Sequence, residues 1–252
     1  MLAIIDYGAG NTYNVAKAFA YLGYESQLTS DPAQIAASSA LVLPGVGAFN
    51  AAYRKLQADG LVTAIKAEVA KGKPLLGICL GMQLLFDSSE EYGNTPGLGL
   101  IPGRVIPIPA NNLLVPQVGW NQNKLLQEQS LFKRVKDEYT YFVHSYYAKC
   151  EQQYVVSYVD YGVKVPAIVN YQNVYGMQFH PEKSGQVGLG LLKDFMEGNG
   201  LRWFYQRLIY KTVKVSVSIK ETLQRKPLFR QPRLNKLKKL MQRVSTLYTW
   251  WI

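Results

Sequence analysis

Short, uninterrupted apolar segments that end in glycine-rich turns constrain the fold of this chain most strongly. They occupy residues 2–5, 41–43 and 75–78. Stretches with apolar residues at helical spacing follow them, at about 12–22, 48–57, 60–71 and 80–86. Continuous apolar strands that alternate with helices are typical of a parallel sheet covered on both faces. The sequence therefore predicts an α/β fold.

The second half of the chain has a different pattern. Segments rich in β-branched residues and tyrosine, separated by turn residues, lie near 104–109, 114–119, 140–148, 154–160, 165–170 and 173–179. Such segments indicate additional strands, some of them antiparallel. A final helix is predicted from about 187 to 196, before a Gly-Asn-Gly turn. We expect a central, mostly parallel sheet flanked by helices, with antiparallel strands added in the second half.

The net charge of +11 is concentrated in the last fifth of the chain. Residues 201–252 hold 13 lysines and arginines and one acid, whereas residues 1–200 hold 15 basic and 16 acidic residues. The positive charge therefore says nothing about the partners of the main domain. We expect one domain at 1–200 and a basic extension of unknown role at 201–252. Part of the extension has the spacing of a basic amphipathic helix, which suits an anionic membrane, nucleic acid or an acidic protein surface.

The composition also bears on location and metal content. No apolar run approaches the ~20 residues of a membrane-spanning helix, and the N-terminus lacks the features of a secretory signal. We therefore expect a cytoplasmic protein with reduced thiols at Cys79 and Cys150. With two cysteines and two histidines in the whole chain, neither a structural zinc site nor another metal or cofactor is expected.

Cys79 lies in a Gly-x-Cys-x-Gly segment between a predicted strand and a predicted helix. This is the context of a nucleophile elbow, in which a tight turn exposes the central side chain at the edge of the sheet. The N-terminus of the following helix favours the thiolate. The amide of Leu80 is placed to donate to an oxyanion. The motif alone is equally consistent with a buried cysteine whose neighbouring glycines serve helix–strand packing.

A thiol nucleophile needs a base, and the base needs a group that fixes its orientation. His180 follows a predicted strand, and Pro181 and Glu182 come next. Because residues i and i+2 of an extended chain point to the same side, we expect Glu182 to hold the ring of His180 while its other nitrogen faces Cys79. We expect Pro181 to prevent a helix from starting there. For His144, a structural or substrate-contacting role is favoured over that of a second base.

Two motifs, GICLGMQLLF around Cys79 and GMQFHPEKS around His180, resemble those of the class I glutamine amidotransferases, which use a Cys-His-Glu triad. Five further segments narrow the resemblance to the glutaminase subunits of imidazole glycerol phosphate synthase, from histidine biosynthesis. They are DYGAGN at 6–11, LPGVGAF at 43–49, VGWN at 118–121, YFVHSYY at 141–147 and HPEKSGQVGLGLL at 180–192. The resemblance covers about residues 1–198 and ends where the basic extension begins.

The resemblance implies roles for particular residues. The catalytic triad would be Cys79, His180 and Glu182. The oxyanion hole would be formed by Val46, Gly47 and Leu80. The glutamine pocket would be lined by Gly45, Gly47, Gln83, His144, Ser145 and Tyr146. An interface or gating role would fall to Asn11, Trp120, Tyr141 and Lys183, although each of these is equally consistent with an ordinary surface residue.

The implied activity is hydrolysis of glutamine to glutamate and ammonia. The ammonia would pass to a (β/α)8-barrel cyclase subunit, the partner in a heterodimer, which makes imidazole glycerol phosphate and aminoimidazole-carboxamide ribonucleotide. One alternative keeps this chemistry but feeds ammonia to a sugar-modifying synthase for surface polysaccharide. A second alternative is a non-catalytic binding module that acts through the basic extension.

Overall fold

The computed structural model describes residues 1–109 and 113–201. The basic extension predicted at 201–252, and the amphipathic helix within it, therefore lie outside the described residues except for Leu201. Within the described ranges, no helix is both long enough and apolar enough to cross a membrane.

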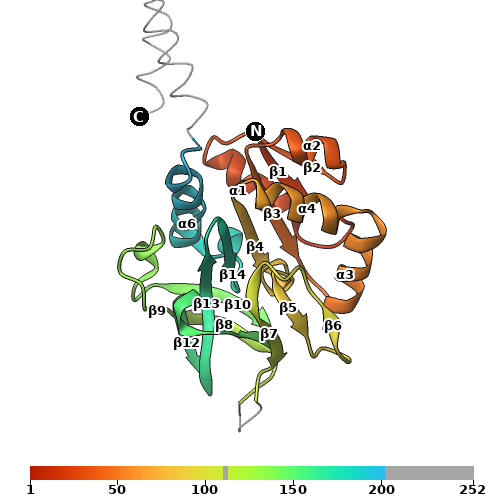
Figure 1. The fold of residues 1–252 in the computed structure, drawn as a ribbon. Coiled ribbons are helices and arrows are strands. Elements are labelled where there is room, and N and C mark those ends of the chain that lie inside the picture. The colour runs from red at the N-terminus through yellow and green to blue at the C-terminus, as the bar shows by residue number, and fades with distance from the viewer. Residues whose placement is uncertain (110–112, 202–252) are drawn as a thin grey trace, which may run out of the picture. The chain divides into compact units, whose positions relative to one another are not determined.

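The central sheet has eight strands in the order β2-β1-β3-β4-β14-β13-β12-β9 (Figure 1). The first five strands are parallel: β2 (Ser26–Thr29), β1 (Leu2–Ile5), β3 (Ala40–Gly45), β4 (Leu75–Cys79) and β14 (Val174–Met177). The others join by antiparallel pairing: β13 (Val163–Tyr171), β12 (Val155–Tyr161) and β9 (Lys124–Leu125). The predicted mixed sheet, parallel in the first half of the chain and antiparallel in the second, is confirmed.

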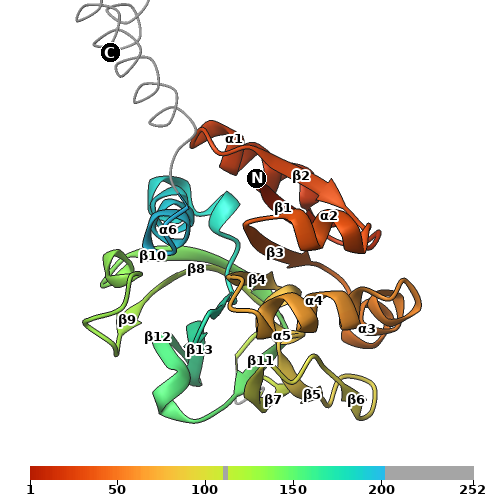
Figure 2. The ribbon, with the colours of Figure 1, turned by 45° about the horizontal axis from the view of Figure 1, so that its top comes forward.

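Helices cover both faces of this sheet, as Figure 2 shows. One face packs against α1 (Thr12–Tyr21) and α6 (Gly185–Gly198). The other packs against α2 (Pro32–Ala37), α3 (Phe49–Ala58) and α4 (Leu61–Ala70). Alternate side chains of a strand point to opposite faces, so Ile4 joins the first cluster and Ile5 the second. Burial on both faces explains why β1, β3 and β4 are apolar throughout.

Two smaller sheets complete the fold. One contains β5 (Phe86–Ser89), β6 (Thr95–Pro96), β7 (Ile101–Pro107) and β11 (Tyr146–Lys149), in the order β11-β7-β5-β6. The other pairs β8 (Gln117–Gln122) with β10 (Tyr139–His144). Short 3-10 turns occur at η1 (Lys133–Val135), η2 (Gln152–Tyr154) and η3 (Pro181–Lys183).

Two sequence predictions of element boundaries were wrong. The helix expected over 80–86 ends after one turn, as α5 (Leu80–Gln83), because Phe86 begins β5 and pairs with β7. The single strand expected over 140–148 is divided at Ser145 into β10 and β11, which belong to different sheets. In both cases tertiary pairing overrides the local pattern.

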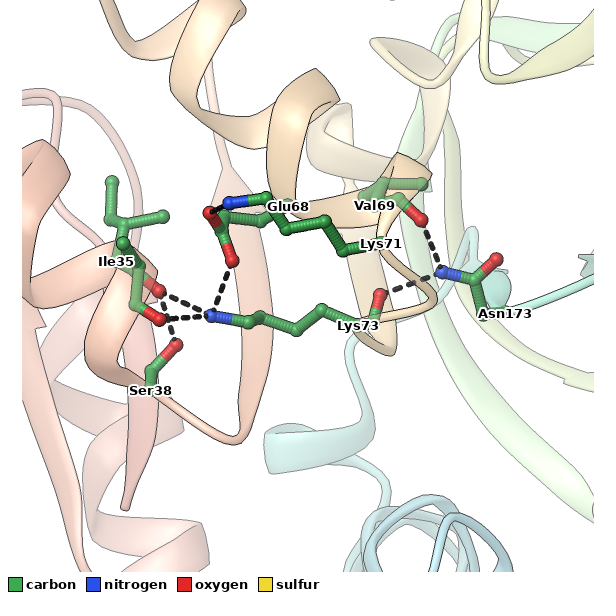
Figure 3. A network of polar contacts seen from close by, with 8 residues as sticks. Ile35, Ser38, Glu68, Val69, Lys71, Lys73 and Asn173 are labelled. Atoms are coloured by element: carbon green, nitrogen blue, oxygen red, sulfur yellow. Dashed lines mark hydrogen bonds and ion pairs between the residues drawn. The ribbon is translucent and has the colours of Figure 1, made fainter.

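A polar network fixes the edge of the sheet opposite Cys79, where β4 begins (Figure 3). The Lys73 ammonium donates to the carbonyl oxygens of Ile35 (2.8 Å) and Ala36 (2.7 Å) at the end of α2. It also pairs with the Glu68 carboxylate of α4 at 2.8 Å. The Asn173 amide donates to the Lys73 carbonyl at 2.7 Å. The network thus ties α2, α4 and the loops that precede β4 and β14 together.

Candidate active site

Cys79 lies at the carboxyl end of β4, which is flanked by the parallel strands β3 and β14 near the middle of the eight-stranded sheet. Its backbone has φ 55° and ψ −114°, a conformation that non-glycine residues rarely adopt and that is found at nucleophile elbows. The predicted strained turn is therefore present, with the strain at Cys79 itself. The flanking glycines serve close packing instead. A Cβ on Gly81 would overlap the Leu43 carbonyl oxygen, and one on Gly77 would lie 2.6 Å from the Gly81 carbonyl oxygen.

The turns that follow β1 and β3 pack against this elbow. The Tyr7 hydroxyl donates a hydrogen bond to the Pro44 carbonyl oxygen at 3.0 Å. A Cβ on Gly45 would lie 2.6 Å from that hydroxyl and 2.9 Å from the Gly81 nitrogen. One on Gly10 would lie 3.5 Å from the Gly45 Cα. Because parallel strands end at the same edge of a sheet, the glycine-rich segments at 6–11, 43–49 and 77–81 form one packed unit.

His180 and Glu182 meet as the sequence predicts. The Nδ1 atom of His180 lies 2.8 Å from the Oε1 atom of Glu182, and both side chains are almost fully buried. The local backbone differs from the expectation. Pro181 begins the 3-10 turn η3 instead of continuing an extended chain, and proline is favoured at the first position of a helical turn. The turn, and not strand alternation, brings the carboxylate to the ring.

A ring of hydrogen bonds holds the backbone of His180 in place. The His180 amide donates to the Tyr141 carbonyl (3.0 Å), and the Tyr141 amide donates to the Ser184 hydroxyl oxygen (3.0 Å). The Ser184 hydroxyl in turn donates to the His180 carbonyl (2.7 Å). Gly188 of α6 packs directly on this turn, since a Cβ there would overlap the Pro181 carbonyl oxygen. His180 is therefore anchored to β10 and α6.

The electrostatics of His180 suit a proton donor. Burial lowers its pKa, but the Cys79 thiol and the Glu182 carboxylate outweigh that effect and raise the pKa to about 9. In the part of the chain that the structure describes, no hydrogen bond of normal geometry reaches its Nε2 atom. His180 is thus charged at neutral pH, with one nitrogen held by Glu182 and the other available to exchange a proton.

His144 has the opposite character. Its Nδ1 atom lies 2.9 Å from the Tyr146 carbonyl oxygen, which can only accept, so Nδ1 carries the proton. Burial lowers the pKa of His144 to about 4, assisted by the charge of His180 and against the Tyr146 hydrogen bond. A neutral ring with Nε2 unprotonated is a hydrogen-bond acceptor. This agrees with the preference for a structural or substrate-contacting histidine over a second base.

A cavity of about 350 Å³ opens beside Cys79. Its lining includes His180 and most residues predicted for the oxyanion hole and the glutamine pocket, namely Val46, Gly47, Leu80, Gln83, His144, Ser145 and Tyr146. Gly45 is not part of this lining and lies beneath it, against Tyr7. Leu80 is the first residue of α5, where an amide has no partner within the helix. These amides and side chains therefore surround a space of the size that a small substrate needs.

Glu91 also lines the cavity, and sequence reasoning missed it. Its Oε2 atom accepts from the Phe49 amide at the start of α3, at 2.6 Å. Glu91 follows another acid in a loop, which is the usual pattern of solvated residues, so the sequence carries no signal for this role. Pro116 and Val143 also belong to the lining. Among the described residues, no group of three or more His, Cys, Asp or Glu side chains is arranged to hold a metal ion.

Three of the four residues predicted for an interface lie together near the cavity. Trp120 and Tyr141 are cross-strand neighbours on β8 and β10, with ring centroids 6.1 Å apart. The Lys183 ammonium lies 5.9 Å from the centre of the Tyr141 ring, and Lys183 also lines the cavity. Trp120 is 52% exposed. Asn11 immediately precedes α1, and its side chain makes no capping hydrogen bond there. The contact of these residues with a partner stays a prediction.

Comparisons with known proteins agree with this fold. A family model described as glutamine amidotransferase class-I matches residues 3–198. The chain is 57% identical over 198 residues to the imidazole glycerol phosphate synthase subunit HisH of Lactiplantibacillus plantarum, which covers 78% of this chain and 95% of that protein. The chain is also 46% identical over 198 residues to the imidazole glycerol phosphate synthase subunit HisH of Listeria monocytogenes, and this match again covers 78% of this chain and 95% of that protein.

Solved structures show the same fold at low sequence identity. A crystal structure of a glutamine amidotransferase has a TM-score of 0.64 at 19% identity, and covers 79% of this chain and 98% of its own. The structure of PurLQS from Thermotoga maritima has a TM-score of 0.61 at 18% identity, and covers 78% and 97%. Together with the family match over most of the sequence, these likenesses establish that the chain belongs to the class I glutamine amidotransferase family.

Proposed function

We propose that this chain is the glutaminase subunit of an imidazole glycerol phosphate synthase and that it releases ammonia from glutamine at Cys79. The observation that carries the proposal is the joint placement of Cys79 and His180 on one cavity, with Glu182 bonded to the far side of the His180 ring. The relatives that bear this enzyme's name are 46–57% identical over 198 residues. That level of identity favours the histidine pathway over a sugar-modifying synthase.

In the proposed reaction, the Cys79 thiolate attacks the side-chain carbonyl carbon of glutamine. The carbonyl oxygen becomes an oxyanion, which accepts hydrogen bonds from backbone amides of Val46 or Gly47 and of Leu80. The C–N bond then breaks as His180 gives its Nε2 proton to the leaving nitrogen, and ammonia departs. A glutamyl thioester remains on Cys79.

Water completes the cycle. His180, now neutral, removes a proton from water, and the resulting hydroxide attacks the thioester carbonyl. The C–S bond breaks, glutamate leaves, and the thiolate and the imidazolium are restored. Glu182 stabilises the imidazolium in both halves of the cycle through its 2.8 Å contact with Nδ1.

The remaining cavity groups are assigned to glutamine recognition. Glu91 is the acid of the cavity lining that does not take part in the chemistry, and its charge suits the α-ammonium group of glutamine. His144 offers an acceptor nitrogen, which suits the carboxamide NH₂ group. Gln83 is held by its own hydrogen bonds to the Tyr146 carbonyl (2.8 Å) and Gln178 (3.1 Å). It therefore shapes the pocket wall around the substrate.

The proposed partner is a (β/α)8-barrel cyclase subunit that receives the ammonia. Trp120, Tyr141 and Lys183 form an aromatic and cationic cluster next to the cavity, which suits a protein interface with a hydrophobic centre. Lys183 belongs both to this cluster and to the cavity lining. Docking on this cluster would place the partner beside the site where ammonia is released.

We further propose that residues 1–200 form the catalytic domain and that residues 201–252 are an accessory basic extension. The family match ends at residue 198, which supports this division. A chain truncated after residue 201 should hydrolyse glutamine with the cyclase at a rate within about twofold of the full-length chain. A truncated chain that folds and binds the cyclase but shows no activity would contradict the accessory role.

The proposed function is tested by a glutaminase assay of the purified chain, with and without a cyclase subunit from a close relative. We expect glutamate release that the cyclase stimulates strongly, and imidazole glycerol phosphate when the ribonucleotide substrate is present. Strong stimulation by a sugar-modifying synthase and none by the cyclase would overturn the pathway assignment.

A further inference from the structure

Tyr7 is a buried polar residue that no catalytic step uses. It follows β1, and only 2% of it is exposed. Its hydroxyl donates to the Pro44 carbonyl oxygen at 3.0 Å. Burial raises the pKa of Tyr7, and the charge of nearby Cys79 raises it further, so the hydroxyl stays protonated at every working pH. Tyr7 is therefore a permanent donor placed beneath the active-site turn.

The turn that Tyr7 contacts carries the proposed oxyanion donors. We call residues 44–47, which end β3 and lead to α3, the oxyanion turn. Its base is packed tightly, because a Cβ on Gly45 would approach the Tyr7 hydroxyl to 2.6 Å and the Leu80 Cβ to 3.0 Å. Its tip is not. Val46 is 44% exposed, and Gly47, at φ 96°, has no atom within 4 Å of the place where a Cβ would lie.

The tip therefore depends on its base for position. Pro44 has no backbone N–H group, so it cannot donate to the neighbouring strand. Its carbonyl oxygen receives a side-chain hydrogen bond from Tyr7, which ties the base of the oxyanion turn to the segment that follows β1. Oxyanion donors act only when they lie within about 2.7–3.1 Å of the developing charge. A loosened base would move the Val46 and Gly47 amides out of that range.

We propose that Tyr7 is a positioning residue that fixes the oxyanion turn through its hydrogen bond to Pro44, so that the turn is ready to stabilise the tetrahedral intermediate. This inference rests on the proposed glutaminase function. It assigns Tyr7 to the oxyanion-dependent steps and not to the nucleophilicity of Cys79, and the two can be measured separately.

The test is Tyr7→Phe in the full chain with its cyclase partner. We expect kcat for glutamine hydrolysis to fall about tenfold, since misplaced catalytic groups cost one to two orders of magnitude, with KM changed less than about twofold. Alkylation of Cys79 by iodoacetamide displaces iodide from a saturated carbon and forms no oxyanion. Its rate should therefore equal that of the wild type between pH 6 and 9.

Tyr24→Phe is the matched control. Tyr24 is also buried, but its hydroxyl has no hydrogen-bond partner among the described residues. This variant should match the wild type in hydrolysis and in alkylation. Tyr7→4-fluorophenylalanine serves as a second variant if Tyr7→Phe does not fold, because it fills the volume of the hydroxyl while removing the donor.

Wild-type hydrolysis by either Tyr7 variant would overturn the inference. So would a parallel loss of hydrolysis and of Cys79 alkylation, which would indicate general damage to the elbow. If the proposed function is wrong, the wild-type chain releases no glutamate. If only the Tyr7 inference is wrong, the wild-type chain is active and the Tyr7 variants hydrolyse glutamine at the same rate, so the two failures are distinguishable.

Discussion

The Nδ1 atom of His180 lies 2.8 Å from the Oε1 atom of Glu182, and 3% and 1% of their side chains are exposed. The Oε2 atom of Glu182 has no partner within the described residues. A buried carboxylate oxygen without a partner costs free energy, so the carboxylate is not placed there to stabilise the fold alone. Its single contact fixes the orientation of His180 and helps to raise the pKa of that ring.

Glu182→Gln should therefore impair catalysis more than folding. The amide keeps the shape of the side chain but removes the charge that stabilises the imidazolium. We expect kcat to fall about a hundredfold or more, while KM for glutamine stays within about threefold. Steady-state glutaminase assays measure both. Glu128→Gln is a control, because Glu128 is an exposed acid whose one ion pair among residues 1–109 and 113–201 is with exposed Lys136. Equal losses in the two variants would contradict the role of Glu182.

The two histidines of this chain should titrate far apart. We expect His180 to titrate near pH 9, and His144 near pH 4 with its proton on Nδ1. Because the chain contains only these two histidines, two-dimensional ¹H–¹⁵N NMR of histidine-labelled protein resolves both, and His144→Gln assigns them. A midpoint for His180 near its ordinary 6.5 would contradict the ion-pair description of the site.

The raised pKa of His180 also sets an alkaline limit on activity. Above about pH 9 the His180 ring loses the proton that it must give to the leaving nitrogen, so kcat/KM should decrease about tenfold per pH unit there.

The free energy of unfolding should also decrease as the pH rises. A base whose pKa is raised by folding stabilises the native state fully below its unfolded value of 6.5, and this stabilisation is lost as the pH rises through about 9. Urea unfolding at pH 7 and pH 10 measures the second effect.

Much of this fold could be predicted from the sequence because its strands are short and apolar throughout. Residues 2–5, 41–43 and 75–78 are apolar without interruption, which is a local signal of a central parallel strand. The structure buries all of them. By contrast β2, with sequence SQLT, pairs along one edge only and has a half-polar pattern. α2 begins with the usual start signal of a capping Asp31 followed by Pro32, but its six residues are too few to show a helical repeat. Edge elements depend on tertiary contacts that a local pattern does not encode.

The candidate site divides in the same way. The placement of Cys79, His180 and Glu182 close together could be predicted, because few residue types can act as nucleophile, base and orienting acid and these three lie in recognisable motifs. Ser184 and Glu91 could not, since a serine and a surface-loop acid have no distinctive pattern. Their positions depend on backbone groups of Tyr141, His180 and Phe49 that only the fold brings near. The glycines around Cys79 serve helix–strand contact, which is the role that the alternative interpretation of the motif gave them.

Lys73→Met should destabilise the protein, whereas Lys71→Met should not. Both lysines pair with Glu68, but the side chain of Lys73 is 10% exposed and that of Lys71 is 68% exposed. Removing Lys73 also takes one donor from each of two carbonyl oxygens at the end of α2, although the Ile35 oxygen keeps its hydrogen bond from the Ser38 hydroxyl. We expect the midpoint of thermal unfolding to fall by about 5 °C or more for Lys73→Met, and by about 1 °C or less for Lys71→Met. Differential scanning calorimetry compares the two, and equal shifts would refute this account of the network.

The central claim is that Cys79 is the nucleophile that attacks glutamine. Cys150 is the internal control, because burial and the charge of Glu151 raise the pKa of its thiol to about 11. Cys79→Ala should lower glutamate release by about a thousandfold or more, and Cys150→Ala should leave it unchanged. An ammonia-dependent reaction of the complex should survive in both variants.

The most direct measurement is mass spectrometry of the complex with the cyclase, quenched in acid while it turns over glutamine. We predict a glutamyl group on the peptide that contains Cys79, removable by hydroxylamine as a thioester requires, and none on the peptide that contains Cys150. Undiminished glutamate release by Cys79→Ala, with no glutamyl group on Cys79 of the wild-type chain, would contradict the account.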